Sequence, residues 1–134
     1  MKKLLKLIKE ARYCWICGNG GSAATAEHFT NDLFSKGIRA FCLNSNVSII
    51  TMIANDFGYE YIYSMQLEKY ASKDDLLITI SCSGTSPNIV EALEVARYMG
   101  MKVYEFETFG KDDRNYEKLE DKHLQLVHKI KEAL

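Results

Sequence analysis

The stretch Arg12-Tyr-Cys-Trp-Ile-Cys-Gly-Asn-Gly-Gly-Ser22 decides the fold, because it runs from an apolar strand into a glycine-rich loop. We predict the strand at 12–17 and a helix at about 23–36, which Gly37 ends as a C-capping glycine. The apolar residues of the strand do not alternate with polar ones, which is typical of a strand covered on both faces of a parallel sheet. The stretch therefore predicts a β-α unit.

Strand and helix patterns continue to alternate along the 134-residue chain. Repeated β-α units indicate a parallel sheet with helices on both faces. The fold class that we predict is α/β, as a three-layer, doubly wound sheet of about four strands in a single domain over 1–134. Further strands are expected at 39–43, 76–80 and 101–108, and further helices at 2–11, 46–54, 59–71, 87–99 and 113–133. In this division, 1–11 is a short N-terminal helix, 12–108 the core and 113–133 a C-terminal helix.

Composition excludes several classes of protein. The 17 basic and 18 acidic residues give a formal charge of −1, so no overall field draws the chain to nucleic acid or to an anionic membrane. No window reaches the ~18 to 20 apolar residues that a membrane span needs. Lysines interrupt the apolar residues of 1–10, unlike those of a signal peptide. We expect a cytoplasmic protein with no nucleic-acid or membrane partner.

The four cysteines do not form an obvious metal or disulfide motif. Cys14 and Cys17 have C-x-x-C spacing, but residues three apart on a strand point to opposite faces. These two thiols are therefore not expected to bridge or to share a metal. In a cytoplasmic protein we expect the cysteines to be structural and reduced.

Two loops have the composition of a phosphate site. The loop 18–22 follows a strand, exposes backbone N–H groups and opens a helix, whose N-terminus attracts an anion. The loop 81–87 also precedes a helix. Because both follow strands of a parallel sheet, they should lie at its ligand-binding edge, where they suit a phosphomonoester. The second loop contributes four hydroxyls, those of Ser81, Ser83, Thr85 and Ser86.

Other interpretations of these loops remain open or can be excluded. Both loops could be only helix caps and tight turns. The spacing Gly18-x-Gly20-x-x-Ala23 fits a dinucleotide fingerprint, but that site also needs an acidic residue near the end of the second strand. The segment 43–46 has none, and no Gly-Lys-Ser/Thr sequence supports a Walker A loop. No nucleotide cofactor is expected.

Three motifs occur in order: Cys17-Gly-Asn-Gly-Gly-Ser-Ala-Ala-Thr-Ala-Glu-His-Phe29, Ile53-Ala-Asn-Asp-Phe-Gly-Tyr59 and Ile80-Ser-Cys-Ser-Gly-Thr-Ser-Pro-Asn88. Together they resemble the SIS (sugar isomerase) domain family and, within it, the phosphoheptose isomerases, from about 12 to 106. The resemblance implies a flavodoxin-like fold and a homotetramer with shared active sites. It also implies conversion of sedoheptulose 7-phosphate to D-glycero-D-manno-heptose 7-phosphate, which supplies heptose for lipopolysaccharide or capsule. The chain looks like a shortened form, so neighbouring subunits should complete its pocket.

Roles for individual residues follow from the same resemblance. The family has a threonine where this chain has Cys82, so we expect Cys82 to bind through its backbone N–H. Contacts to the substrate or its phosphate are implied for Asn19, Gly20, Gly21, Ser22, Asn55, Asp56, Ser81, Cys82, Ser83, Ser86 and Glu120.

The predicted catalytic residues are Asp32 and His128. His28 and Asp32 lie four apart and share a helix face. Such a pair is often only a solvated ion pair, but its helix begins at the glycine loop, which favours a functional role. The resemblance implies that Asp32 is the base, at a position where the family has glutamate, and that His128 is its acid/base partner. Aspartate is one methylene shorter than glutamate, and a misplacement of the base by ~1 Å costs about 100-fold in rate. One alternative is therefore a non-catalytic SIS module that binds a phosphosugar or a protein partner. Another alternative is an isomerase for another phosphosugar.

The resemblance also implies a zinc site at His28, Asp32, Glu120 and His128, with Glu120 replacing a glutamine. Histidine and carboxylate side chains are suitable zinc ligands. If Glu120 and His128 lie in one helix, however, eight residues separate them by ~12 Å, and one subunit could not place both on one ion. His123 is expected to be packed or at the surface, and Tyr59, Tyr61 and Tyr63 to pack between subunits.

Overall fold

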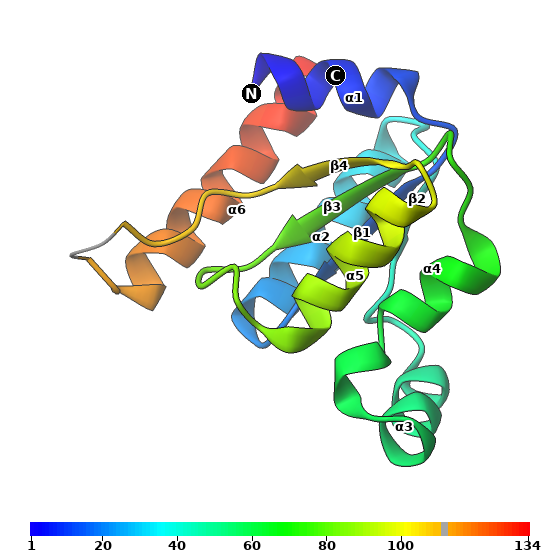
Figure 1. The fold of residues 1–134 in the computed structure, drawn as a ribbon. Helices are drawn as coiled ribbons and strands as arrows, with labels where there is room; N and C mark the ends of the chain where they lie inside the picture. The colour runs from blue at the N-terminus through cyan, green and yellow to red at the C-terminus, as the bar shows by residue number, and fades with distance from the viewer. Residues whose placement is uncertain (111–112) are drawn as a thin grey trace.

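The computed structural model describes residues 1–110 and 113–134, and its centre is a parallel sheet of four strands (Figure 1). The strand order is β2-β1-β3-β4. The predicted α/β fold with about four strands is confirmed. The strands are β1 (Cys14–Gly18), β2 (Ala40–Cys42), β3 (Leu76–Ile80) and β4 (Lys102–Glu105).

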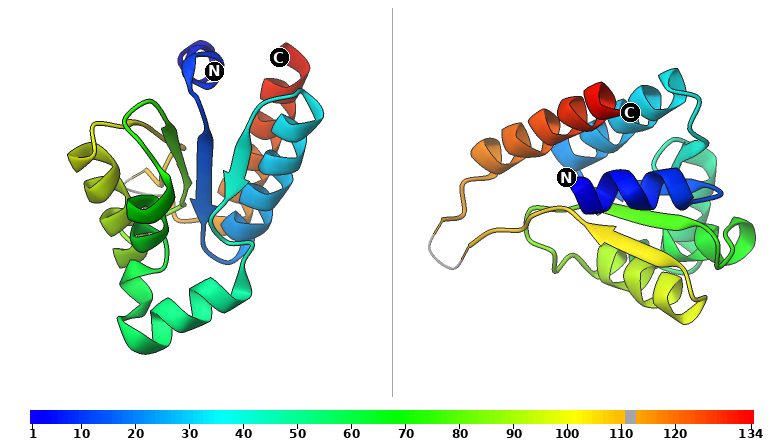
Figure 2. Two further views of the ribbon diagram at one scale, coloured as in Figure 1. Left: turned by 90° about the vertical axis from the view of Figure 1, so that its right-hand side faces the viewer. Right: turned by 90° about the horizontal axis from the view of Figure 1, so that it is seen from above.

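Helices cover both faces of the sheet and make three layers (Figure 2). The helices α1 (Lys2–Glu10), α2 (Gly21–Ser35) and α6 (Tyr116–Ala133) pack on one face. The helices α4 (Ser64–Tyr70) and α5 (Pro87–Tyr98) pack on the other, together with part of α3 (Val47–Asp56). A short 3-10 helix, η1 (Tyr59–Tyr61), joins α3 to α4. Among the described residues, no helix has both the length and the apolar character that a bilayer crossing requires.

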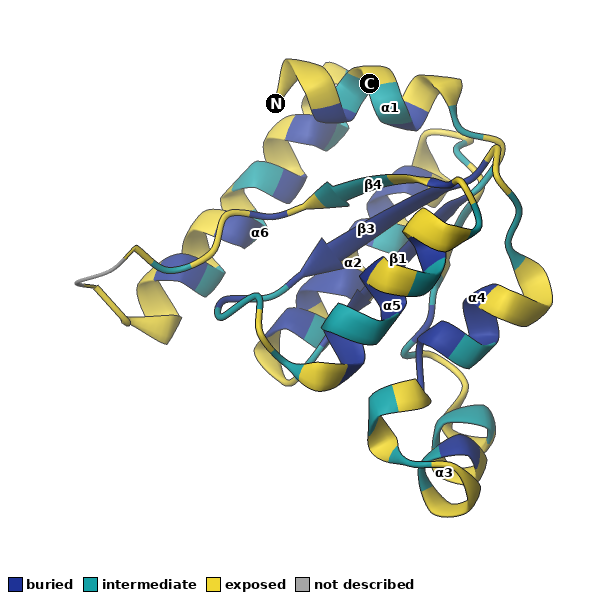
Figure 3. Ribbon diagram, viewed as in Figure 1, coloured by how far each residue is buried: buried dark blue, intermediate teal, exposed yellow. Residues whose placement is uncertain are grey.

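The sheet separates the two halves of the core, and its strands β1 and β3 are buried along their whole length (Figure 3). Cys14 and Ile16 face the α1, α2 and α6 layer, whereas Trp15 and Cys17 face the α3, α4 and α5 layer. The expected opposite orientation of the two C-x-x-C thiols is therefore confirmed. Burial, with a contribution from the charge of Asp75, raises the pKa of Cys14 to about 12.

The register of β1 and β3 places the two candidate phosphate loops side by side. Gly18, the last residue of β1, pairs with Ile80, the last residue of β3. A Cβ on Gly18 would lie 2.6 Å from the Ser22 carbonyl oxygen and 2.7 Å from that of Ile80. Only glycine therefore lets the end of β1, the start of α2 and the end of β3 approach this closely.

Several elements differ in extent from the predictions. The predicted strand 12–17 begins at Cys14, and the predicted helix 59–71 is interrupted, which directs Tyr63 into the core. The predicted strand 101–108 is shorter, and the last helix begins at Tyr116 because the Asn115 side chain caps it by accepting a hydrogen bond from the Lys118 amide. The predicted domain 1–134 also includes residues 111 and 112, which lie outside the described residues.

Candidate active site

The glycine loop between β1 and α2 is tied to the start of α5. Gly20 adopts a φ of +57°, which turns the chain from the strand into the helix. The side-chain amides of Asn19 and Asn88 bond to each other in both directions, with N–O distances of 2.8 and 3.0 Å. This amide pair fixes the orientation of Asn19, a predicted substrate contact.

Tyr63 supports the same loop from inside the core. Its hydroxyl lies 2.6 Å from the Gly18 carbonyl oxygen and 2.7 Å from Asn19 Oδ1, and it accepts a hydrogen bond from Asn44 at 2.8 Å. Burial raises the pKa of Tyr63, so the hydroxyl keeps its proton and can donate it to the loop. The expectation that Tyr63 packs between subunits is wrong, because its side chain is buried within its own chain.

A polar pocket of about 100 Å³ lies between the two loops and the first turns of α6. Hydroxyls and backbone groups dominate it, and no lysine or arginine belongs to the lining that the structure describes. The predicted phosphate residues of both loops are brought together here. The lining residues are Asn19, Ser22, Ser81, Cys82, Ser83, Ser86, Tyr116 and Glu120.

Glu120 gives this pocket a negative charge. Its carboxylate lies against Gly21, where an added Cβ would approach Oε1 to 2.5 Å. Burial raises the pKa of the nearby Cys82 thiol, and the negative charge of Glu120 raises it further. The pocket therefore favours ligands that bring hydrogen-bond donors toward Glu120 and an anionic group toward the serine-rich loop 81–87, which we call the serine loop.

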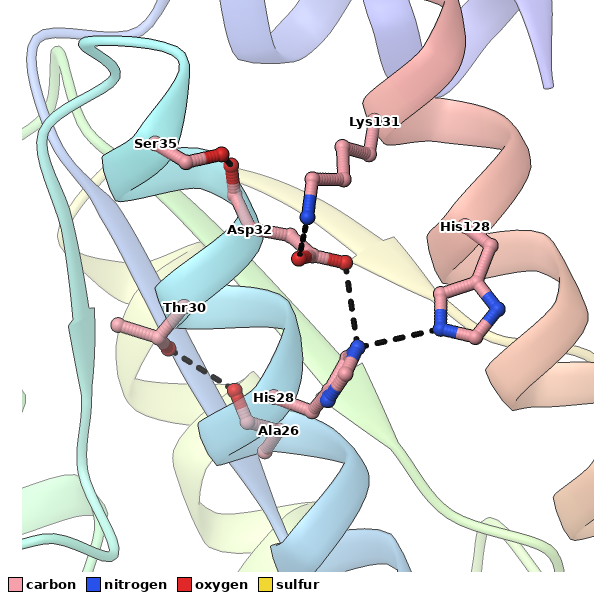
Figure 4. Close-up of polar contacts among 7 residues, drawn as sticks. All are labelled: Ala26, His28, Thr30, Asp32, Ser35, His128 and Lys131. Atoms are coloured by element: carbon pink, nitrogen blue, oxygen red, sulfur yellow. Dashed lines mark hydrogen bonds and ion pairs between the residues drawn. The ribbon is translucent and has the colours of Figure 1, made fainter.

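A second polar cluster lies farther along α2 and α6 (Figure 4), and it is formed by His28, Asp32, His128 and Lys131. His28 and Asp32 come from α2, and His128 and Lys131 from α6. The Nε2 atoms of the two histidines are 3.1 Å apart, and His28 Nε2 lies 3.3 Å from Asp32 Oδ2. The pairing of α2 with α6 thus joins the two predicted catalytic residues, Asp32 and His128, in one cluster.

The geometry of the cluster fits a zinc ion. One ligand atom each from His28, Asp32 and His128 lies within 4.8 Å of the others. Tetrahedral zinc with bonds of about 2.0–2.1 Å places neighbouring ligand atoms roughly 3.3 Å apart, close to the 3.1 and 3.3 Å of two of the three pairs of ligand atoms. In addition, Asp32 Oδ2 is buried and makes no hydrogen bond. Two histidines and one carboxylate, whose buried oxygen is unsatisfied, together form a candidate metal centre.

Glu120 does not belong to this centre. It lies eight residues before His128 on the continuous helix α6, about 12 Å along the axis, and its carboxylate lies in the loop pocket instead. The predicted set of four ligands therefore cannot hold one ion within one chain. The structure keeps His28, Asp32 and His128 together and separates Glu120 from them.

Other predicted residues lie apart from both regions. Asn55 and Asp56 end α3, are exposed and bond to each other at 2.8 Å, and they do not line the loop pocket of this chain. His123 is buried against Phe106, and its Nε2 lies 2.7 Å from the Glu107 carbonyl oxygen. The expectation that His123 is a packed residue is confirmed.

Several residues that complete the site are not predicted from the sequence. Lys131 follows His128 by three residues and therefore shares its helix face, so spacing could have identified it. Asn88 is the second residue of α5, just after the serine-rich loop 81–87, which is a weaker signal. Tyr63 and Asn44 offered no signal, because only the folded chain places them beneath the glycine loop.

Comparison with known proteins identifies relatives of the chain. The SIS domain family profile matches residues 1–106. A phosphoheptose isomerase of Helicobacter pylori (strain HPAG1) is 47% identical over 93 residues, covering 65% of this chain and 48% of that protein. A phosphoheptose isomerase of Aliarcobacter butzleri (strain RM4018) is 42% identical over 107 residues, covering 75% of this chain and 57% of that protein. The chain thus spans about half the length of these relatives.

A solved structure shows the same architecture. The phosphoheptose isomerase of Neisseria gonorrhoeae superposes with a TM-score of 0.88 at 28% sequence identity. The superposition covers 98% of this chain and 80% of that one.

Proposed function

The chain belongs to the SIS domain family, and from this premise we propose that it is an aldose–ketose isomerase of phosphosugars, with sedoheptulose 7-phosphate as substrate and D-glycero-D-manno-heptose 7-phosphate as product. The names of the two bacterial relatives support this substrate. The observation that carries the proposal is the arrangement of two regions along one helix pair, with a phosphate-type pocket at one end of α2 and α6 and an acid/base cluster farther along.

The phosphate is proposed to bind in the loop pocket. Ser81, Ser83 and Ser86 supply hydroxyl donors, and the N-termini of α2 and α5 add backbone N–H groups and a positive dipole end. Glu120 faces the same space and accepts hydrogen bonds from sugar hydroxyls. The amide pair and Tyr63 hold the glycine loop in place while the ligand binds.

The reacting carbons are proposed to lie at the charged cluster. An open-chain ketose phosphate has its carbonyl near one end and its phosphate at the other, and Glu120 of the pocket and His128 of the cluster are separated by about 12 Å along α6. Asp32 Oδ2, which makes no hydrogen bond, removes a proton from C1, and the resulting enediol regains that proton at C2. His128 moves a second proton between the oxygens on C1 and C2, so the reaction neither gains nor loses atoms.

A zinc ion is proposed at His28, Asp32 and His128. When bound there, it would polarise the carbonyl oxygen as a Lewis acid, and it would occupy Asp32 Oδ2, so the proton removal by Asp32 proposed above belongs to the metal-free site. The three side chains are already close together without the ion, since His28 lies between Asp32 and His128 and contacts both.

We further propose a cytoplasmic homotetramer whose subunits share their sites. Asn55 and Asp56, which lie away from the pocket of their own chain, would then contact substrate bound by a neighbouring subunit. Sedimentation measurements test the assembly, and a stable monomer would contradict it.

Turnover of sedoheptulose 7-phosphate, with and without added zinc, tests the proposed reaction. We expect the aldose product to accumulate. Pentulose and hexulose phosphates, assayed in parallel, show whether the preference is for a seven-carbon substrate. If no aldose forms under either condition while the sugar phosphate still binds, the enzymatic proposal is wrong.

A second candidate is a non-catalytic SIS module that binds a phosphosugar or a protein partner. The observation that favours it is the short Asp32 side chain, one oxygen of which is already held by Lys131. Replacing Asp32→Glu separates the two candidates. A gain in turnover supports the enzyme, whereas no turnover in either form together with intact sugar-phosphate binding supports the binding module.

A further inference from the structure

Lys131 is a charged member of the cluster to which the proposed reaction gives no role. Its Nζ atom donates a hydrogen bond to Asp32 Oδ1 at 2.5 Å, across the contact between α6 and α2 (Figure 4). The Asp32 side chain is 1% exposed and that of Lys131 40%. A buried carboxylate needs a partner of opposite charge, and Lys131 provides it from the surface side.

The ion pair also fixes the direction of the second carboxylate oxygen. Lys131 engages Oδ1, and Oδ2 is the oxygen that is directed at the histidine pair. Oδ2 faces His28 Nε2 at 3.3 Å and makes no hydrogen bond. Asp32 can therefore offer only one oxygen to the histidine pair.

The charge of Lys131 also works against a cation in the same cluster. With neutral imidazoles, His28, Asp32 and His128 carry a net charge of −1, which the ammonium group cancels. A divalent cation on Oδ2 would share one carboxylate with Lys131, and like charges at such short range repel. Solvent at the partly exposed lysine weakens this repulsion but does not remove it.

We propose that Lys131 is a positioning residue that holds Asp32 as a single-oxygen ligand and lowers the affinity of the His28/Asp32/His128 centre for a divalent cation. The inference rests on the zinc part of the proposed function and not on the isomerase reaction. It implies that the charge on α6, and not only the three ligands, sets how readily the cation binds and leaves.

Zinc titration of the metal-free protein tests the proposal without any sugar. We expect Lys131→Met to bind zinc about tenfold more tightly than the wild type, because it removes the opposing charge. Lys129→Met is the matched control, since it removes an exposed lysine from the same helix, and it should leave the affinity unchanged. The same Lys131→Met protein without metal should unfold at a lower temperature, because Asp32 loses its partner.

Tighter zinc binding together with lower thermal stability distinguishes a positioning role from a purely structural one. Loss of a purely structural residue would reduce stability and leave zinc affinity unchanged or weaker. Lys131→Gln keeps a hydrogen-bond donor without the charge, and it should also bind zinc more tightly if Lys131→Met does not fold. Equal or weaker zinc binding by the folded Lys131 variant than by Lys129→Met overturns the inference, as does no zinc binding by any of the proteins. Failure of the isomerase proposal is read separately, from wild-type turnover of the ketose phosphate.

Discussion

The loop pocket and the charged cluster lie on the same pair of helices but are held in place by different means. In the loop pocket, strand register and neutral hydrogen bonds fix the chain, and Asn19, Asn88 and Tyr63 form a closed network. In the cluster, charged and titratable groups from α2 and α6 meet, and one buried oxygen of Asp32 is left without a partner. This difference is the reason for the proposal that the pocket binds the phosphate and the cluster carries the chemistry.

The largest effect is expected where the cluster loses its base. Asp32→Asn should reduce isomerase turnover by about 10²- to 10⁴-fold, the range for loss of a general base, while sugar-phosphate binding changes little. Steady-state turnover and a binding titration on the same preparation measure both quantities. A fall in affinity that matches the fall in turnover would show that the two regions are not divided as described.

The next largest effect is expected where the loop pocket is most tightly packed. Gly18→Ala should lower the free energy of unfolding by about 3 kcal/mol, because its Cβ would meet two backbone carbonyl oxygens. Chemical denaturation measures the change. Gly110→Ala is the control, since the space around Gly110 is open and its φ is ordinary. Equal stability of both variants would contradict the close approach of β1, α2 and β3.

A smaller loss is expected from the network beneath the glycine loop. Tyr63→Phe removes the hydroxyl that donates to the glycine loop, which should cost about 0.5–1.5 kcal/mol of stability. The Gly18 carbonyl keeps its bond from Asn44, and the Asn19 amide oxygen keeps its bond from Asn88. Thermal or denaturant unfolding gives the value, with Tyr98→Phe at an exposed position as control. We also expect weaker sugar-phosphate binding, since Asn19 loses part of its orientation. Unchanged stability and binding would show that the network is not needed.

Removing the negative charge of the loop pocket should have a modest effect, and it should strengthen phosphate binding. Glu120→Gln should tighten binding of inorganic phosphate several-fold, because a carboxylate beside an anion is unfavourable. Glu117→Gln, on the exposed first turn of the same helix, is the control. Phosphate titration at constant ionic strength measures the change. Weaker binding by Glu120→Gln than by its control would mean that phosphate does not lie near this carboxylate.

The smallest effect concerns the Cys82 thiol. Its pKa is raised by burial and by the charge of Glu120, so the reactive thiolate forms only at a higher pH than for an ordinary cysteine. Glu120→Gln removes the second cause, and the onset of Cys82 alkylation should move to lower pH. Alkylation rates at Cys82, followed by peptide mass spectrometry across a pH series, test the direction. An onset that stays in place, or moves to higher pH, would contradict the proximity of Glu120.

The pocket could be predicted more completely than the cluster, for physical reasons. Gly18 and Ser81 each directly follow an apolar strand pattern, and neighbouring parallel strands bring such loops to one edge. The Asp32–Lys131 contact depends instead on how two helices, 99 residues apart in sequence at this point, rotate against each other. The position of Glu120 illustrates the same limit, since its residue type suits a metal but the helix places it in the pocket. The burial of Tyr63 could not be predicted either, because it depends on the interruption between η1 and α4 that turns its side chain inward.

In the proposed reaction, one molecule binds by its phosphate in the loop pocket while it loses a proton at the charged cluster. The most direct test is proton exchange at the carbons next to the carbonyl of sedoheptulose 7-phosphate in deuterated water, followed by NMR. We predict that the wild type introduces deuterium there, and that Asp32→Asn binds the sugar phosphate but exchanges at least about 100-fold more slowly. No exchange by the wild-type protein while the sugar phosphate is bound would contradict the account.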